Sequence, residues 1–497
     1  MPNVLTTDSL AEILARLAYA NREFNAAHPG EKADRQPVHT VYGGAHLFTA
    51  DIAHKLGAAA LQIVEEFAPD ADSFARALGI GAQPPAAAAG KPPARMPGVH
   101  PRLSTPGSGE KPSAPPRRES ASPAGPPPGA ALAGAVYARV IDKLQHEPVE
   151  DYRIDFEDGY GNRSDAEEDG HAVAAASEMA KGQREHTLPP FVGIRIKPLS
   201  EELKARSLRT LDLFVSTLLQ ETSGVLPPHF VITLPKITSP EQVSALIDAF
   251  EMLERGARLF PGTLRMELMV ETPQSVIASR GTLAIPELIL RARGRCRGLH
   301  FGIYDYTAGL NITAIHQSPS HPACDFARHV MQVCAAGTGV TLSDGATNVL
   351  PVPPHRAAPD GPKLTDAQLE ENRRAVHRAW RVHYDDVLMS LRNAYYQGWD
   401  LHPGQLPSRY AAVFAFFLEA RHEAAARLKQ FIDKAAQATL MGDVFDDAAT
   451  GQALLNFFLR GINCGAFSEE DALAIGLTYE ELRLRSFVKI LDRRRGV

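Results

Sequence analysis

An acidic turn follows one apolar run of the chain, and an arginine lies within the next run. The turn reads Asp155-Phe156-Glu157-Asp158-Gly159, with three carboxylates in four positions. This much negative charge is costly unless solvent, hydrogen bonds or a cation compensates it. The arginine is Arg195, whose planar fork suits bidentate contact with a carboxylate. Two interpretations stay open: a solvated turn whose Glu157 pairs structurally with Arg195, or an arginine that binds an anionic substrate.

Two further acids, Glu271 and Asp305, also follow apolar runs. Glu271 ends Leu268-Met269-Val270-Glu271, and Asp305 comes shortly after Gly298-Leu299-His300-Phe301-Gly302. If neighbouring parallel strands precede them, their carboxylates lie close together and can share one cation. Ligation by oxygen alone, completed by water and substrate, is typical of Mg²⁺. The alternative is two unrelated loop acids.

Lys236 and His402 are two more polar residues at the ends of apolar runs. Lys236 ends Leu234-Pro235-Lys236, where it can contact a substrate carboxylate, pair with a nearby acid or face solvent. His402 follows Gly398-Trp399-Asp400-Leu401. A single histidine is usually structural, but at the end of a strand it is also a candidate general acid or base.

The elements that must position these residues alternate between short β-like runs and helical stretches. This alternation predicts a parallel sheet with crossover helices. Because eight strand–helix units close a barrel, we expect an α/β fold of the (β/α)8 TIM-barrel type. The polar residues above would then lie at the carboxyl ends of the strands, where such barrels carry their active sites. The expected strands are Val38–Tyr42, Tyr152–Phe156, Phe191–Ile196, Phe230–Leu234, Met266–Val270, Gly298–Ile303, Val340–Leu342 and Gly398–Leu401.

One segment, Gly81–Ala130, interrupts this pattern. It holds 14 of the 38 prolines and no Phe, Trp or Tyr. Because so little apolar surface cannot offset the entropy of ordering, we expect a disordered Pro-rich insertion. Its PxxP-like spacings could dock an SH3-type partner, but a tolerated surface insertion is favoured. The expected division is an N-terminal helical segment at 1–35, the barrel start at 36–80, the insertion at 81–130, the rest of the barrel at 131–407 and a helical C-terminal extension at 408–497.

Helical spacing is also evident late in the chain. Thr365–Gln397 predicts one long helix before the eighth strand, and Ser408–Ala436 and Ser468–Asp492 predict helices of the extension. Ser468-x-x-Asp471 resembles a capping box at the start of a helix. The extension is expected to cover one end of the barrel.

Composition excludes several classes of protein. The net charge of −6 over 497 residues gives no footprint for nucleic acid or an anionic membrane surface. The four cysteines include no CxxC pair, so no zinc site, redox motif or disulfide framework is indicated. No signal-peptide-like or transmembrane run of apolar residues is found, which leaves a soluble cytoplasmic protein as the expectation.

Seven short motifs, in this order and each at the end of an expected strand, give the chain a recognisable signature over about Val38–Gln405. Together they resemble the citrate lyase beta-subunit / HpcH/HpaI aldolase family, with similarities to malate synthase. These families belong to barrels that act on phosphoenolpyruvate or pyruvate-like substrates. The motifs are Asp155-Phe156-Glu157-Asp158-Gly159, Gly193-Ile194-Arg195-Ile196, Leu234-Pro235-Lys236-Ile237, Val270-Glu271-Thr272-Pro273, Gly302-x-x-Asp305, the turn Ser343-Asp344-Gly345 after the seventh strand, and His402-Pro403-Gly404-Gln405.

The resemblance implies roles for individual residues. Glu271 and Asp305 would be ligands of Mg²⁺ or Mn²⁺, and Arg195 would bind the substrate carboxylate or an enolate oxygen. Glu157, with its acidic neighbours, would orient Arg195 or metal-bound water. Backbone N–H groups around Asp305–Thr307 would hold the carboxylate of a 2-oxo acid, which makes Tyr306 and Thr307 expected substrate-binding positions together with Lys236.

The implied activity is a magnesium-dependent carbon–carbon lyase or aldolase that acts on a 2-oxo acid or hydroxyacyl thioester through an enolate. A coenzyme A thioester is a possible substrate, and a homo-oligomer is the expected assembly. The Met-Glu-Asp-Arg-Ala-Thr-like motif that carries the catalytic aspartate of malate synthases is not found in the tail. His46, His402 and an acid of the extension therefore stay open as the general base. The alternatives are a malate synthase-like condensation or thioester hydrolysis, and a barrel that binds without catalysis.

Overall fold

The computed structural model describes residues 5, 7–30, 34–81, 128–358, 361–433, 439–441, 444–446, 448–473 and 476–495. Eight parallel strands follow one another around a closed barrel, and the eighth pairs with the first. The strands are β1 (His39–Gly44), β2 (Asp151–Asp155), β3 (Phe191–Arg195), β4 (Val231–Leu234), β5 (Met266–Val270), β6 (Cys296–Phe301), β7 (Thr341–Ala346) and β8 (Gln397–Asp400). The predicted (β/α)8 barrel is therefore confirmed.

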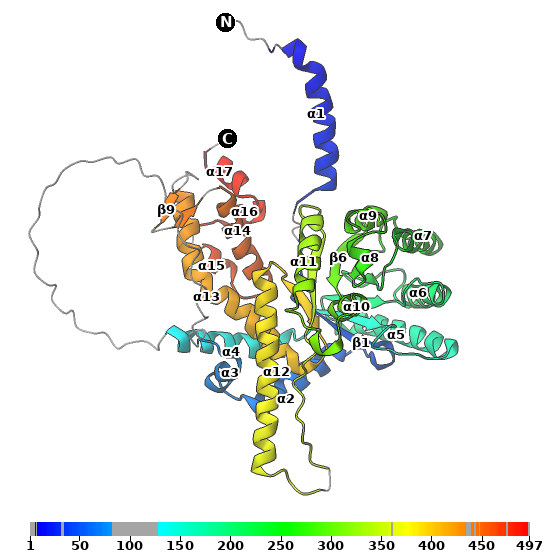
Figure 1. Ribbon diagram of the computed structural model, residues 1–497, viewed down its shortest axis with the longest axis vertical. Coiled ribbons are helices and arrows are strands. Elements are labelled where there is room, and N and C mark those ends of the chain that lie inside the picture. The colour runs from blue at the N-terminus through cyan, green and yellow to red at the C-terminus, as the bar shows by residue number, and fades with distance from the viewer. Residues whose placement is uncertain are drawn as a thin grey trace, which may run out of the picture.

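Helices surround the barrel, and further helices of the C-terminal part gather to one side of it (Figure 1). The helices are α1 (Thr7–Ala27), α2 (Ile52–Phe67), α3 (Ala71–Leu78), α4 (Pro128–His146), α5 (Asp165–Glu185), α6 (Lys204–Glu221), α7 (Pro240–Ala257), α8 (Pro273–Val276), α9 (Ile285–Arg291), α10 (Ile303–Gly309), α11 (Pro322–Ala335), α12 (Asp366–Arg392), α13 (Leu406–Asp433), α14 (Ala448–Asn463), α15 (Glu469–Leu473), α16 (Tyr479–Leu484) and α17 (Phe487–Arg495). The other described elements are three 3-10 turns and one antiparallel strand pair. The turns are η1 (Ala45–Leu47), η2 (Ala314–His316) and η3 (Pro403–Gln405), and the pair consists of β9 (Thr439–Met441) and β10 (Val444–Asp446). Within these ranges, no helix combines the length and apolar character needed to cross a lipid bilayer.

The strands match their expected positions within a few residues, because each is a short apolar run buried between barrel and helices. One motif was placed wrongly. Ser343-Asp344-Gly345 lies inside β7 and not in a turn after it. A side chain at Gly345 would come within 2.8 Å of the Phe301 carbonyl, so this strand position needs glycine to pass β6 closely.

Most of the expected insertion, residues 82–127, lies outside the described residues. Its last three positions, 128–130, instead begin α4. The predicted helix Ser408–Ala436 corresponds to α13, and the predicted stretch Ser468–Asp492 is divided among α15, α16 and α17, whereas α14 was not predicted. Ser468 and Asp471 cap α15 reciprocally. Because α13 packs against both α12 and α4, it closes the ring of helices directly after β8.

The barrel interior carries charge where such barrels usually pack branched apolar side chains. Arg153 of β2 bonds to Asp151, and its Nη2 lies 2.6 Å from Glu267 Oε2 of β5. His300 Nε2 of β6 lies 3.0 Å from the same Glu267 oxygen. Trp399 Nε1 donates to His300 Nδ1 at 3.2 Å, which leaves the His300 proton on Nε2, facing Glu267. The buried charges are thus paired, as burial requires.

Candidate functional site

Asp155 and Arg195 form a rigid ion pair at the floor of the site. They are register partners at the ends of β2 and β3, and both are buried. Arg195 Nε and Nη2 donate to the two Asp155 oxygens at 2.7 and 2.6 Å. Asp155 also accepts the N–H groups of Glu157 and Gly159, at 3.0 and 2.7 Å. This bidentate pair holds the guanidinium in one orientation.

The rest of the Arg195 guanidinium faces an acid and two aromatic rings. Nη1 lies 3.2 Å from Glu157 Oε2, so the ion pair with the Glu157 group is present. The guanidinium stacks 4.8 Å from the Tyr42 ring centroid and 6.0 Å from that of Trp399. The acids, Asp155 foremost, hold the pKa of Arg195 well above its ordinary value although burial opposes this. Arg195 is therefore a permanent positive charge at this end of the barrel.

Lys236 lies at the centre of the acids. Its ammonium bonds to Glu157 and lies 3.0 Å from Asp158 and 3.4 Å from Asp305. Its N–H donates to Glu271 Oε1 at 2.7 Å, and its φ of +48° is a left-handed conformation that is uncommon outside glycine. One backbone position thus brings a cation and an N–H to four carboxylates. Of the three alternatives for Lys236, pairing with nearby acids is the one the geometry provides.

Glu271 and Asp305 differ in burial. Glu271 follows β5 and is only 1% exposed, whereas the Asp305 side chain on α10 is 43% exposed. Burial raises the pKa of Glu271 to about 7, with Asp305 adding to the effect while Lys236 and Arg195 oppose it. A side chain at Gly302 would lie 2.5 Å from Glu271 Oε2, so only glycine leaves room for this carboxylate. Both acids contact Lys236, through its N–H and its ammonium respectively, as expected of neighbouring strand ends.

Tyr306 and Thr307 do not present their side chains to these acids. Tyr306 is buried against Phe301, with ring centroids 5.4 Å apart, and its N–H bonds to the Gly302 carbonyl. The Thr307 hydroxyl is fully buried and donates to the Ile303 carbonyl at 2.7 Å. The expected contact was through backbone N–H groups around Asp305–Thr307, and substrate binding at these positions stays a prediction. The N–H groups without a partner at a helix start are those of the first turn, which here begins at Ile303.

His402 and His46 lie apart from the acids. The His402 ring caps η3 by accepting the Gly404 N–H at 3.0 Å, and burial lowers its pKa. His46 packs near Tyr160 and His171, and its Nδ1 is buried without a hydrogen-bond partner among the described residues. No hydrogen bond or ion pair joins either ring to Glu271 or Asp305 in the described ranges. Their role as general base stays a prediction.

The donor set at this end of the barrel suits a hard divalent cation. Five acids, namely Asp155, Glu157, Asp158, Glu271 and Asp305, face only two permanent cations, Arg195 and Lys236. No cluster of three His, Cys, Asp or Glu side chains with metal-site geometry occurs in the described part of the chain. Mg²⁺ commonly takes one or two protein carboxylates and leaves the other positions to water and substrate. Glu271 and Asp305 fit that description.

Two aromatic residues of the site were missed. Tyr42 of β1 and Trp399 of β8 are in contact, with ring centroids 4.7 Å apart and the rings tilted by 38°, and both cover Arg195. The first and last strands of a closed barrel are neighbours, so aromatic residues near the ends of both were the available signal.

Fold and site together define a closed parallel β/α barrel with an acid-rich cluster at the carboxyl ends of its strands. Residues 17–490 match the model of the family described as "Domain of unknown function (DUF6986)", and the chain belongs to that family. None of the curated proteins matches the chain.

Several solved structures are similar to the chain. A citrate lyase from Burkholderia xenovorans LB400 is 19% identical with a TM-score of 0.48, and the match covers 69% of this chain and 92% of that one. A Haloferax volcanii malate synthase in a magnesium/glyoxylate complex is 15% identical with a TM-score of 0.38, covering 75% and 95% of the two chains. The lead(II) complex of the same enzyme is 15% identical with a TM-score of 0.39, covering 73% and 94%. Likeness this distant does not carry an activity from one chain to another.

Proposed function

We propose that the chain is a divalent-metal-dependent enzyme that makes or breaks a carbon–carbon bond beside the carbonyl of a 2-oxo acid or acyl thioester. The observation that carries this proposal is the meeting of Glu157, Asp158, Glu271 and Asp305 around the Lys236 residue, next to the fixed charge of Arg195. The acids exceed the cations, which favours a bound metal ion. The arginine supplies the positive charge that a carboxylate or a developing oxyanion needs.

Glu271 and Asp305 would hold Mg²⁺ or Mn²⁺, which when bound would supply Lewis acidity to a carbonyl oxygen. Arg195 stabilises negative charge that grows on the substrate oxygen as the enolate forms. Asp155 keeps the guanidinium in place through two hydrogen bonds, so this charge needs no reorganisation during the reaction. Lys236 neutralises Glu157 and Asp158, and it can instead turn to a substrate carboxylate.

Titration of the metal-stripped protein with Mg²⁺ or Mn²⁺, with and without pyruvate, oxaloacetate or glyoxylate, tests the proposal. We expect calorimetry to detect oxo-acid binding only when metal is present. Glu271→Gln and Asp305→Asn should each weaken metal binding at least roughly tenfold, because each removes a charged ligand. Glu287→Gln, an exposed acid of α9, is the matched control and should bind as the parent does.

Unchanged metal affinity in both site variants would refute the assignment of the ligands. Oxo-acid binding that needs no metal would refute the proposed chemistry. Absence of both metal and oxo-acid binding would favour a barrel that binds without catalysis. Turnover of an acyl-CoA with glyoxylate would instead favour a condensing enzyme.

A further inference from the structure

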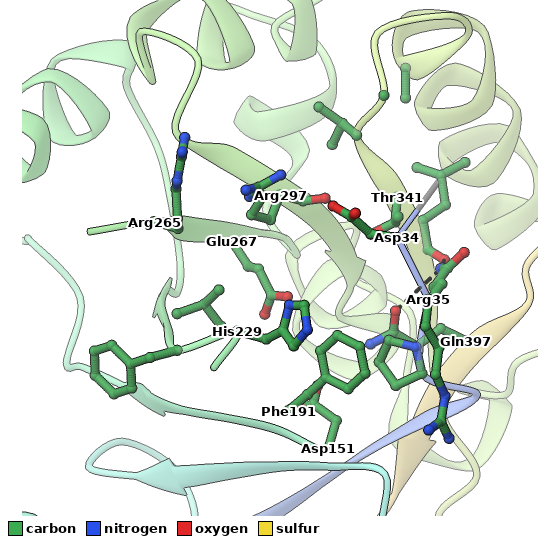
Figure 2. A pocket seen from close by; sticks show the side chains of 18 of the residues that line it. Asp34, Arg35, Asp151, Phe191, His229, Arg265, Glu267, Arg297, Thr341 and Gln397 are labelled. Atoms are coloured by element: carbon green, nitrogen blue, oxygen red, sulfur yellow. Dashed lines mark hydrogen bonds between the residues drawn. The ribbon is translucent and has the colours of Figure 1, made fainter. Parts of the chain in front are cut away.

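A cavity lies at the opposite end of the barrel from the acids. Its volume is about 980 Å³, at the upper end of the usual range for small-molecule sites. Strand starts form its wall, including Asp151 of β2, Phe191 of β3, Glu267 of β5 and Gln397 of β8. Parallel strands run in one direction, so this cavity and the acid cluster open at opposite ends. The cavity is seen from close by in Figure 2.

The cavity wall carries surplus positive charge. Its acids are Asp34, Asp151 and Glu267, and Arg153 pairs with the latter two. Arg258, Arg265 and Arg297 also line the cavity, and none of them makes an ion pair with a described residue. Arg265 Nη1 has a single hydrogen bond, to the Gly294 carbonyl at 3.3 Å. Among the described lining residues, three guanidinium groups without an ion pair thus share the cavity with one remaining acid, Asp34.

A β-bulge places Arg297 at the cavity wall. Met266 pairs with Cys296 and Glu267 pairs with Gly298, which leaves Arg297 as an extra residue on β6. Bulges re-aim side chains and occur often beside functional sites. Arg265 directly precedes the paired residue Met266, so the two arginines are neighbours across adjacent strands. Burial and the charges of Arg297 and Arg295 lower the pKa of Arg265, which shows how closely the positive charges are set.

An aromatic surface shares the cavity with these arginines. The rings of Phe191 and His229 stack with centroids 4.5 Å apart and an interplanar angle of 29°. Figure 2 shows both rings and the side chains of Arg265 and Arg297 around the same cavity. Leu226 and Leu259 add apolar lining. One end of a ligand thus meets guanidinium groups while another meets flat rings.

We propose that this cavity binds a phosphorylated small molecule with a flat ring, the chemistry of a nucleotide. Its phosphate oxygens bind Arg265 and Arg297, whose forks match phosphate geometry. Its ring packs against Phe191 and His229. The site is independent of the metal-dependent function proposed for the other end of the barrel.

Calorimetric titration with ADP, in buffer free of divalent cations, tests the proposal on the full chain. We expect ADP to bind, and adenosine and pyrophosphate each to bind at least roughly tenfold more weakly because each lacks one half of the recognised chemistry. Arg265→Gln and Arg297→Gln should each weaken ADP binding by a similar factor. His229→Ala should weaken ADP binding and leave pyrophosphate binding unchanged.

Two controls locate the binding. Arg291→Gln changes an exposed arginine of α9 outside the cavity and should bind ADP as the parent does. Glu271→Gln alters the acid cluster and should also leave ADP binding unchanged. Thermal melts of Arg265→Gln and Arg297→Gln check that these variants fold. Failure of ADP to bind at millimolar concentration, or equal binding by parent and both glutamine variants, would overturn the proposal.

Discussion

The ionisation of Glu271 depends on what lies beside its carboxyl group. The side chain is almost fully buried, and burial is the largest cause of its raised pKa. Lys236 donates one N–H to it, which is too little to replace the lost water. A divalent cation would supply the missing charge. At the scale of one residue, a cation bound beside Glu271 would therefore stabilise the ionised form of its carboxyl group.

Metal-free protein should lose stability as the pH rises through the pKa of Glu271. This pKa is about 7 in the folded chain against an ordinary 4.5, so the folded state holds the proton more tightly. The stabilising contribution is complete below about pH 4.5 and is lost as the pH rises to about 7. Glu271→Gln has no such loss and should be more stable than the parent at pH 8, by up to about 3 kcal/mol.

Urea denaturation of both proteins at pH 5 and pH 8, in EDTA, measures this difference. The gap in unfolding free energy should widen with pH. Saturating Mg²⁺ at pH 8 should stabilise the parent and have little effect on the variant. A gap that stays constant between the two pH values would show that Glu271 does not hold its proton more tightly in the folded state.

At the scale of elements, Asp400 joins four segments of the ring. It ends β8 and accepts from Arg409 Nη2 of α13 at 2.9 Å, His39 Nδ1 of β1 at 2.7 Å and His383 Nε2 of α12 at 3.0 Å. Burial opposes its ionisation, but Arg409 and the two histidines hold the pKa of Asp400 well below its ordinary range. This cluster fixes the place where the eighth strand closes on the first.

Asp400→Asn should destabilise the fold by about 3–5 kcal/mol, because it leaves Arg409 buried without its counter-ion. Thermal or urea unfolding measures the change. Asp385→Asn removes an exposed i,i+4 partner of Arg381 on α12 and should cost less than about 0.5 kcal/mol. The double variant Asp400→Asn/Arg409→Met should lose less than the sum of the single changes. An Asp400→Asn protein as stable as the parent would show that the cluster does not hold the barrel closed.

At the scale of the whole molecule, contacts run through the barrel from one end to the other. Glu267 lines the cavity at the strand starts and bonds to His300, which accepts from Trp399. The Trp399 ring lies beside Arg195 of the acid cluster. The two ends are thus separated by a charged layer that is fully paired.

The barrel was predictable because each strand is a short apolar run followed by a helical stretch. The expected strand Met266–Val270 coincides with β5. The meeting of the acids with Arg195 was also predictable, since the ends of the strands lie together in a closed barrel. The direction of individual side chains was not predictable, because the burial of Tyr306 against Phe301 and the cap formed by His402 depend on packing.

The cavity at the strand starts was also not predictable from the sequence. It depends on contacts between residues far apart in sequence, and on the bulge that exposes Arg297. The only local signal is a run of alternating arginines, Arg291-Ala292-Arg293-Gly294-Arg295-Cys296-Arg297. Three of them, Arg291, Arg293 and Arg295, pair with acids instead, so the run alone does not indicate which arginine is available.

The chain leaves and re-enters the described barrel at one point, and this allows a test of residues 82–127 as a unit. A side chain on Gly81 would lie 3.2 Å from Gly129 Cα, so the two flanking glycines are in contact. A short Gly/Ser linker can therefore replace residues 82–127 without moving α3 or α4. Each halving of a flexible loop saves only about 0.6 kcal/mol of closure cost, so the melting temperature should stay constant or rise slightly.

Calorimetric melting of this replacement, compared with the parent and with a scrambled segment of equal length, separates the effect of length from that of sequence. Metal and ADP titrations of the replacement should match those of the parent, because both sites are built from residues in the described part of the chain. A fall of many degrees in both altered proteins would mean that the native sequence of 82–127 packs on the barrel. A fall in the scrambled protein alone would mean that the order of residues in the native segment matters, because the scrambled segment has the same length and composition.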